Sequence, residues 1–310
     1  ILPESRGGHP LEVAISDLET VLEAVNRKFG GTLMFSDFQT SAIVTALQQS
    51  WSKASGSATA VTAGTGMGKT LGFAIPGITD ALIANRGGRR VCSQILVYPR
   101  NDLAKDQFSQ ITGMVKEVNK LLIGRGEANR CIGTALDADG RIKHSQKNYP
   151  AGIPGAPEWN LGSSNVYHAS SITYGGDRPA AIVACSVESF RRRLRIPQVL
   201  AGLSTGMQRI VFDEIHLSSG TQGGHHSRLV SRCKQIGFRG GSRLTFMGVS
   251  ATIAKPRDHI SKIWRCPPKE VRHVESKMEE DGTPMGIMHH IMLRPRNGTP
   301  EIGALVDMTS

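Results

Sequence analysis

Apolar residues recur at spacings of three and four near the start of the chain. The pattern runs over residues 11–29 and ends at Gly30, so it predicts an amphipathic helix. A second helical pattern begins at Ser36 and continues to about Leu47, where a stretch rich in serine, glycine and alanine at residues 52–57 follows. The beginning of the chain is therefore predicted to be helical.

From about residue 58 the chain alternates short apolar runs with helical patterns. The short runs predict strands at residues 58–63, 94–98, 181–185, 209–212 and 244–249. The longest helical pattern lies at residues 103–122, and Pro76 is expected to interrupt or kink an earlier one. Strands separated by helices indicate βαβ units, in which helices cover both faces of a parallel sheet. The sequence therefore predicts an α/β fold with a parallel sheet flanked by helices.

Regions outside this alternation set the expected domain boundaries. Residues 1–35 are predicted to form an N-terminal helical accessory segment, whereas residues 36–254 carry the α/β pattern. Residues from about 124 to 176 are rich in Gly, Pro, Ser and Asn and show little periodicity, which predicts a long loop insertion. Residues 255–310 are charged and interrupted by prolines, as expected of a linker.

The net charge favours a polyanionic partner. The chain of 310 residues has a formal net charge of +11, which suits nucleic acid or an anionic membrane surface without choosing between them. No apolar run approaches the roughly 18 residues that a membrane span needs, so a membrane protein is not expected. Five cysteines without a C-x-x-C pair speak against a disulfide framework and favour the reducing cytoplasm. Because the chain begins with Ile1 rather than Met, we expect a fragment of a longer protein.

A glycine-rich stretch between the first predicted strand and the next helix has the composition of a phosphate-binding loop. After Ala63 it comprises Gly64, Thr65, Gly66, Met67, Gly68, Lys69 and Thr70. Glycines let backbone amides wrap around phosphate oxygens, and the helix N-terminus adds its positive end. Lys69 would then reach the β- and γ-phosphates of ATP, and the Thr70 hydroxyl would bind Mg²⁺. The general pattern has glycine at the position of Ala63, so a glycine-rich turn before a core helix is the alternative.

Two carboxylates follow the strand predicted at residues 209–212. Asp213 is expected to hold Mg²⁺, and Glu214 to position and polarise the attacking water. Acidic residues after strands are also ordinary loop residues, so this assignment depends on the phosphate-binding loop. Ser250-Ala251-Thr252 directly follows another predicted strand, where such a triplet alone indicates no more than a turn or a helix cap.

Together these motifs resemble the superfamily 2 helicases of the DEAD/DEAH type. Residues 63–70 are similar to motif I of that family, in which alanine is the usual first residue, and Asp213-Glu214-Ile215-His216 resembles motif II in its DExH form. Ser250-Ala251-Thr252 resembles motif III, and residues 98–107 resemble motif Ia. The resemblance implies one RecA-like P-loop NTPase domain over residues 36–254, with ATP and Mg²⁺ as cofactors and Lys69 among the catalytic residues.

The resemblance also implies roles for residues outside the phosphate-binding loop. His216, Ser250 and Thr252 would couple the ATP site to movement on nucleic acid. Gln39 is placed like the glutamine that reads adenine in this family. It also forms a capping-box pattern with Ser36, so both roles stay open.

Nucleic acid in this family lies across the RecA-like domains and contacts motifs Ia, Ib and Ic largely through phosphates. The residues at those positions are Arg100, Asn101 and Ser186, followed by the basic run Arg191, Arg192 and Arg193. Such phosphate contacts are independent of base sequence and depend strongly on salt. The alternative for the arginine run is a solvated helix face.

The function implied by the resemblance is an ATP-dependent helicase or translocase that acts on nucleic acid, with DNA as the expected substrate. The alternative is a nucleic-acid-stimulated ATPase switch or remodeller without processive unwinding. Family members carry a second RecA-like domain that supplies arginine fingers. Residues 255–310 are too few for that domain and would be its linker or first strand. The isolated chain is therefore expected to bind ATP and to hydrolyse it poorly.

A narrower resemblance concerns the bacterial phage-defence helicases. Residues 98–107 and 213–220 look most like large bacterial helicases that include those of DISARM and DpdJ-type defence systems. This resemblance implies further domains of the same polypeptide and defence-system subunits as partners.

Overall fold

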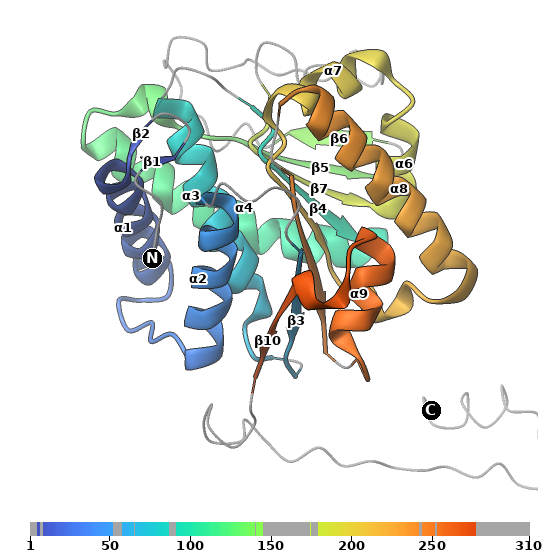
Figure 1. Cartoon of the computed structure of the whole chain (residues 1–310). Helices are drawn as coiled ribbons and strands as arrows, with labels where there is room; N and C mark the ends of the chain where they lie inside the picture. The colour runs from blue at the N-terminus through green and yellow to red at the C-terminus, as the bar shows by residue number, and fades with distance from the viewer. Residues whose placement is uncertain are drawn as a thin grey trace, which may run out of the picture.

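An eight-stranded sheet forms the centre of the fold, and helices cover both of its faces (Figure 1). The computed structural model describes residues 5–6, 9–51, 58–64, 66–86, 91–139, 141–144, 174, 179–241, 244–251 and 253–276. The strand order is β10-β3-β9-β8-β4-β7-β5-β6. Their bounds are β3 (Ala58–Thr62), β4 (Gln94–Tyr98), β5 (Thr134–Ala138), β6 (Arg141–His144), β7 (Ile182–Ser186), β8 (Arg209–Phe212), β9 (Thr245–Ser250) and β10 (Val271–Glu275). All neighbouring strands in this sheet pair in parallel except β5 and β6, which are antiparallel.

Two layers of helices bury the two faces of the sheet. One layer consists of α1 (Leu11–Lys28), α2 (Asp37–Trp51), α3 (Lys69–Arg86) and α4 (Asn101–Gly124). The other consists of α6 (Val187–Arg193), α7 (Pro197–Gly206), α8 (Gly220–Arg239) and α9 (Pro256–Trp264). On β4, Leu96 packs in the first layer, whereas Ile95 and Val97 pack in the second. Because both faces are covered, the strands read as continuous apolar runs, as the sequence predicted.

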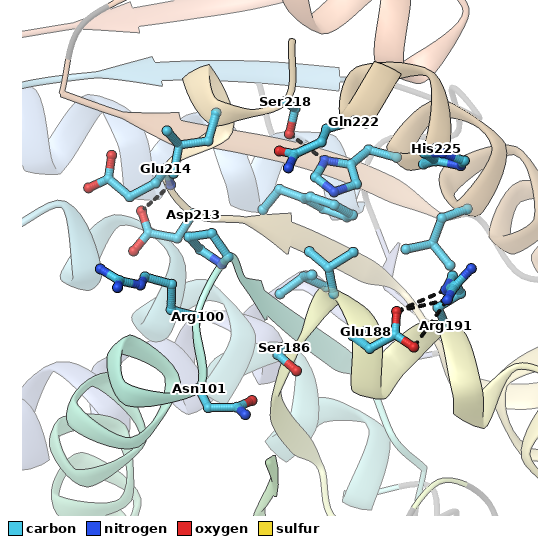
Figure 2. Close-up of a pocket in the computed structure, with 17 residues that line it drawn as sticks. Arg100, Asn101, Ser186, Glu188, Arg191, Asp213, Glu214, Ser218, Gln222 and His225 are labelled. Carbon is cyan, nitrogen blue, oxygen red and sulfur yellow. Dashed lines mark hydrogen bonds and ion pairs between the residues drawn. The ribbon is translucent and has the colours of Figure 1, made fainter. Parts of the chain in front are cut away.

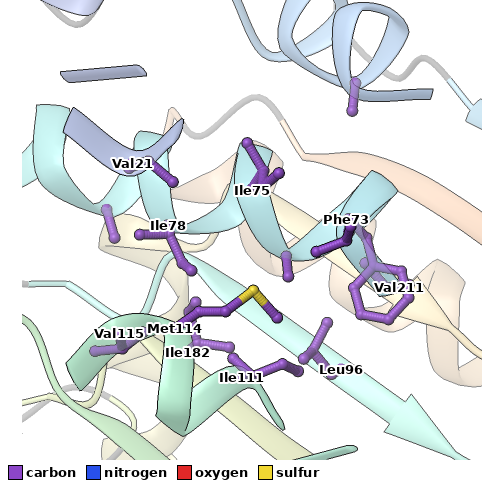
Figure 3. Packing of buried hydrophobic residues seen from close by; sticks show 14 of the residues in the cluster. Val21, Phe73, Ile75, Ile78, Leu96, Ile111, Met114, Val115, Ile182 and Val211 are labelled. Carbon is purple, nitrogen blue, oxygen red and sulfur yellow. The ribbon is translucent and has the colours of Figure 1, made fainter. Parts of the chain in front are cut away.

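The first layer packs closely against the centre of the sheet. Figure 3 shows Phe73, Ile75 and Ile78 of α3 and Ile111, Met114 and Val115 of α4 gathered around Leu96, Ile182 and Val211 of the strands. Helix α3 continues through Pro76, so the expected interruption at that residue is wrong. Among the described residues, no helix is both long and apolar enough to cross a bilayer.

The N-terminal helix is part of this same domain. α1 packs on α3 and α4, and its fully buried Asp17 accepts two hydrogen bonds of 2.8 Å from Arg86. Arg130, in the short 3₁₀ helix η1 (Ala128–Arg130), also contacts the Asp17 carboxylate. The short strands β1 (Ser5–Arg6) and β2 (His9–Pro10) precede α1 and pair with each other. The expected accessory segment therefore shares the core of the α/β domain.

Two other boundary expectations are wrong where the structure describes them. The loop insertion was expected from about residue 124, but η1, β5 and β6 occupy its first part, and β5 pairs in parallel with β7. The search for short apolar runs did not predict β5, because its buried residues include the polar Thr134 and Asp137. Residues 255–276 were expected to be a linker or the start of another domain, yet they form α9, the 3₁₀ helix η4 (Pro268–Glu270) and β10, which pairs with β3. The rest of both regions, apart from Tyr174, lies outside the described residues.

Candidate functional site

The glycine-rich loop lies between β3 and α3, as a phosphate-binding loop requires. Gly66 and Gly68 have φ angles of 84° and 71°, which side chains with a Cβ rarely adopt. The Lys69 ammonium donates hydrogen bonds to the carbonyl oxygens of Ala63 at 2.8 Å and Gly64 at 3.3 Å, so it is held against the loop. Thr65, which the sequence also assigned to this loop, lies outside the described residues.

Gln39 forms both a helix cap and a contact with the loop. The Ser36 amide donates to Gln39 Oε1 at 3.1 Å, and the Gln39 amide donates to Ser36 Oγ at 3.2 Å, which is the capping box. The Gln39 side-chain NH₂ also donates to the carbonyl oxygen of Met67 at 3.2 Å. A Cβ on Gly68 would lie 2.2 Å from Gln39 Nε2, so this contact needs glycine there. The capping role is thus present, and adenine reading stays a prediction.

The two predicted acids stand at the carboxyl end of β8. The Asp213 amide donates to the carbonyl oxygen of Val97 at 3.0 Å, which fastens the end of β8 to β4. The Glu214 amide donates to Asp213 Oδ1 at 3.0 Å, and Glu214 itself has a left-handed backbone with φ of 49°. A non-glycine residue in this conformation is strained, and such strain gathers at functional sites.

Burial controls the protonation of Asp213. It raises the pKa of Asp213 to about 6; the charge of Glu214 also raises this pKa, while the positive charge of Lys69 lowers it. The influence of Lys69 means that the loop lysine and the first acid share one electrostatic neighbourhood. β9 alone separates the strands that carry them. The loop with Lys69 and the acid Asp213 therefore follow two parallel strands that lie one strand apart in the sheet.

The oxygen atoms of Thr70 and Asp213 suit a magnesium ion. Hydroxyl and carboxylate oxygens are the ligand type that Mg²⁺ prefers, and no ion pair of Asp213 is found in the part of the chain that the structure describes. Thr70 Oγ1 donates a 2.8 Å hydrogen bond to Oε1 of Gln107 on α4. Among the described residues there is no cluster of three His, Cys, Asp or Glu side chains that could hold a metal. The hydroxyl and carboxylate oxygens of Thr70 and Asp213 fit an Mg²⁺ ion that phosphate oxygens also bind.

His216 connects the acids to the end of β9. It lies in the 3₁₀ helix η3 (Ile215–Leu217), and its Nδ1 is 2.7 Å from Ser250 Oγ and 3.2 Å from Glu214 Oε2. His259 of α9 further holds η3 through a 2.9 Å contact between its Nε2 and the carbonyl oxygen of Ile215. The predicted coupling residues His216 and Ser250 are thus in contact. Thr252 lies outside the described residues.

A cavity of about 810 Å³ opens beside the acids (Figure 2). Four of the predicted nucleic-acid residues line it, namely Arg100, Asn101, Ser186 and Arg191. Its other charged groups are Asp213, Glu214 and Glu188. The Asn101 NH₂ donates to Asp139 Oδ1 at 2.7 Å, which fixes this side chain at the start of α4. Residues from three different strand ends thus meet in one hollow.

Helix α8 contributes cavity residues that the sequence did not indicate. They are Gln222, His225, His226 and Leu229, and Figure 2 shows Gln222 and His225 across the hollow from Arg100 and Asn101. His226 Nδ1 lies 2.5 Å from Ser218 Oγ, and burial lowers the pKa of His226. A usable signal was proximity in sequence, because α8 begins only a few residues after Glu214.

The arginine run divides into two parts. Arg191 and Arg192 are exposed, and Arg191 pairs with Glu188 of the same helix at 3.0 Å. Arg193 is buried and makes a bidentate pair with Asp137 of β5 at 2.7 and 2.9 Å. The Tyr174 hydroxyl donates to the same carboxylate at 3.0 Å. The assignment of Arg193 to nucleic-acid binding is therefore wrong, since its guanidinium is committed to the core.

Comparison with known proteins finds one matching protein family and several solved structures with a similar fold. Residues 36–138 match the family model of the DEAD/DEAH box helicases, whereas no curated protein matches the chain. The DUF1998 helicase MrfA bound to DNA aligns with 83% of this chain and 29% of its own, at 19% identity and a TM-score of 0.58. MrfA bound to DNA and AMPPNP aligns with 89% of this chain and 30% of its own, at 18% identity and a TM-score of 0.55.

A DEAD-box helicase shares the same fold. Mss116 bound to ssRNA and UDP-BeF aligns with 84% of this chain and 44% of its own, at 16% identity and a TM-score of 0.58. The RecA-like fold and the DEAD/DEAH resemblance predicted from the sequence are confirmed by these matches. The chain spans less than half the length of each of these structures.

Proposed function

We propose that this chain, whose residues 36–138 match the family model of the DEAD/DEAH box helicases, uses ATP to move on, or remodel, nucleic acid. The observation that supports the proposal is the placement of the loop with Lys69 after β3 and of Asp213 and Glu214 after β8, two parallel strands that β9 alone separates. The charge of Lys69 also lowers the pKa of Asp213. The loop amides and Lys69 would bind the β- and γ-phosphates.

Thr70 and Asp213 would hold Mg²⁺, because their oxygens are hard donors and burial of the Asp213 carboxylate favours a cation beside it. When bound, Mg²⁺ neutralises charge that develops on the phosphate oxygens. Glu214 would orient the attacking water and accept its proton. Its backbone turns left-handed directly after Asp213, and in this proposal the two carboxylates have different roles.

Nucleotide binding tests this proposal directly. We expect Lys69→Ala to weaken binding of a fluorescent ATP analogue at least about tenfold, since it removes a charged contact with the phosphates. Lys105→Ala is the matched control, because Lys105 is an exposed lysine that pairs with Asp139. Equal affinity of the wild type and Lys69→Ala would contradict the proposal, as would an equal loss in the control.

ATP turnover by these 310 residues alone should be slow. Arginine fingers of a second RecA-like domain are worth about 10³ to 10⁵ in rate, and the described residues form one such domain. Brisk turnover stimulated by nucleic acid in the isolated chain would contradict this expectation.

The cavity beside the acids is the proposed contact with nucleic acid. Arg100, Asn101 and Ser186 would bind backbone phosphates, with exposed Arg191 and Arg192 at the rim. Reversing both exposed charges, Arg191→Glu with Arg192→Glu, should weaken binding of single-stranded DNA and leave ATP affinity unchanged. Unchanged DNA affinity would mean that these two arginines lie on a solvated helix face and do not bind nucleic acid.

A strand-displacement assay on the full-length protein distinguishes a helicase from an ATPase switch.

We further propose DNA as the nucleic acid, in a cytoplasmic phage-defence system with further domains and subunits as partners. The support is the form of residues 98–107 and 213–220. Competition between DNA and RNA of one sequence tests the substrate, and phage challenge of cells with Glu214→Gln tests the defence role. Preference for RNA would contradict the proposal that DNA is the substrate. Unchanged phage resistance would contradict the proposed defence role.

A further inference from the structure

We infer that Gln107 is a positioning residue for the magnesium-binding hydroxyl of Thr70, an inference that rests on the proposed ATP site. Thr70 lies in the first turn of α3, and Gln107 lies on α4, at the far end of the motif that begins with β4. Thr70 Oγ1 donates to Gln107 Oε1 at 2.8 Å.

The direction of this hydrogen bond decides which part of the hydroxyl can face a cation. A threonine hydroxyl has one proton and two acceptor lone pairs. Because the proton is directed to Gln107, the lone pairs of Thr70 are turned away from α4 and are free to bind a metal. Without an acceptor at this place, the proton could rotate toward the cation, where it would repel the ion.

The position of Gln107 on its helix supports this role. Ala104 and Ile111 lie three residues before and four residues after it, and both are buried. Residues at these spacings share one helix face, so the amide of Gln107 is a polar group on the core-facing side of α4. Gln107 is partly buried there, and Thr70 provides a hydrogen-bond partner for its amide oxygen.

α4 thereby contacts both proposed sites. Asn101 in its first turn lines the cavity, and Gln107 lies six residues further along the same helix, about 9 Å at 1.5 Å per residue. Gln107 itself does not line the cavity. Its effect is therefore expected on the metal and not on nucleic acid.

The magnesium dependence of nucleotide binding tests the inference. The half-saturating Mg²⁺ concentration is measured by binding of a fluorescent ATP analogue, and affinity in EDTA is measured in parallel. We expect Gln107→Leu to raise that concentration about 10- to 100-fold, the range for loss of a group that orients a metal ligand. Affinity in EDTA should stay within about twofold, because the loop contacts with phosphate are intact.

Two further variants separate positioning from a packing role. Gln107→Glu keeps an oxygen acceptor for the Thr70 proton, so its half-saturating Mg²⁺ concentration should remain near that of the wild type. Gln107→Asn withdraws the acceptor by one methylene and should behave like Gln107→Leu, which keeps the inference testable if the leucine variant does not fold. Thr70→Ala is the reference for complete loss of the hydroxyl.

The possible outcomes assign failure to one proposal or the other. Wild-type magnesium dependence in both Gln107→Leu and Gln107→Asn, with a loss in Thr70→Ala, would overturn the inference and leave the ATP site standing. Equal loss in Gln107→Glu and Gln107→Leu would show a packing role and also overturn it. If neither the wild type nor Thr70→Ala binds nucleotide in a magnesium-dependent way, the proposed ATP site itself fails.

Discussion

His216 and Ser250 are joined by a contact of 2.7 Å between the imidazole Nδ1 and the serine hydroxyl, although 33 residues separate them in sequence. The same nitrogen lies 3.2 Å from Glu214 Oε2. Because β8 and β9 are neighbours in the sheet, one side chain links the proposed water-positioning acid to the end of the next strand. A movement of Glu214 can therefore reach β9 without passing through the core.

This link predicts a loss of coupling without a loss of ATP affinity. In the full-length protein, His216→Ala and Ser250→Ala should each lower nucleic-acid-stimulated ATP turnover about tenfold, as expected for one hydrogen bond of about 1.5 kcal/mol. ATP affinity should change little, because neither residue belongs to the phosphate loop. The double variant should be no slower than the slower single variant, since both remove the same contact. Fully additive losses would show that the two residues act separately.

Arg193 predicts a large effect on stability. Arg193→Met leaves the Asp137 carboxylate buried, with Tyr174 as its one remaining side-chain partner among the described residues, and breaking a buried ion pair in this way costs about 3–5 kcal/mol. Urea unfolding of the purified domain measures the change. Arg192→Met is the matched control, because this neighbour is exposed and should change the free energy of unfolding by less than about 0.5 kcal/mol. Equal stability of the two variants would contradict the role assigned to Asp137.

The sequence predicted the parts of the fold whose signal is local. The five strands that lead into motifs were predicted within a residue or two, because their runs are apolar on both faces. β5 and β10 were missed, since β5 buries Asp137 and β10 leaves Arg272 and Glu275 exposed. Each of these segments is stabilised as a strand by pairing with a neighbour, β5 with β7 and β10 with β3, and this pairing cannot be read from the segment's own sequence pattern.

The residues of the candidate site also fall into two groups: those that a sequence motif indicates and those that only the folded structure reveals. Motif spacing identified Lys69, Asp213 and His216 as candidates, because each follows a parallel strand, and the carboxyl ends of these strands lie on the same side of the sheet. Arg193 was misassigned as part of a run of identical residues. It lies three residues after the buried Phe190, which puts it on the core-facing side of α6. Gln222 has no motif at all, and only the folded chain brings it to the cavity.

Gln222 predicts that α8 contributes to nucleic-acid affinity. Gln222→Ala should weaken binding of single-stranded DNA several-fold, because the amide can donate to phosphate oxygens or base edges from the wall of the cavity. The slope of affinity against salt should not change, since glutamine carries no charge. Arg100→Ala, in contrast, should reduce that slope by about one ion. Thr221→Ala is the control, because Thr221 is exposed on the same helix and does not line the cavity. Equal effects of Gln222→Ala and Thr221→Ala on DNA affinity would show that Gln222 of α8 does not contact nucleic acid.

Asp213 predicts a stability cost that depends on pH. Its pKa rises from an ordinary value of 3.8 to about 6 because burial disfavours the charged form. Between these values the folded state binds more protons than the unfolded chain, so the free energy of unfolding falls as the pH rises through this range. Asp213→Asn keeps the oxygen that accepts from the Glu214 amide and removes the charge. It should therefore stabilise the nucleotide-free chain by roughly 1–3 kcal/mol at pH 8 and give no gain at pH 4.

Thermal unfolding at the two pH values measures this difference, with Glu214→Gln as the control. Glu214 is the adjacent acid, its side chain is 30% exposed, and its carboxylate contacts His216. Because burial is the larger cause of the raised pKa of Asp213 and the charge of Glu214 a smaller one, neutralising Glu214 should raise the Tm at pH 8 by less than Asp213→Asn does. A rise of the same size for Asp213→Asn at both pH values would mean that the amide gains a new contact and that charge burial is not the cause. A rise at pH 8 alone would mean that the domain keeps a destabilising charge at the position where Mg²⁺ and the phosphates of ATP are proposed to compensate it.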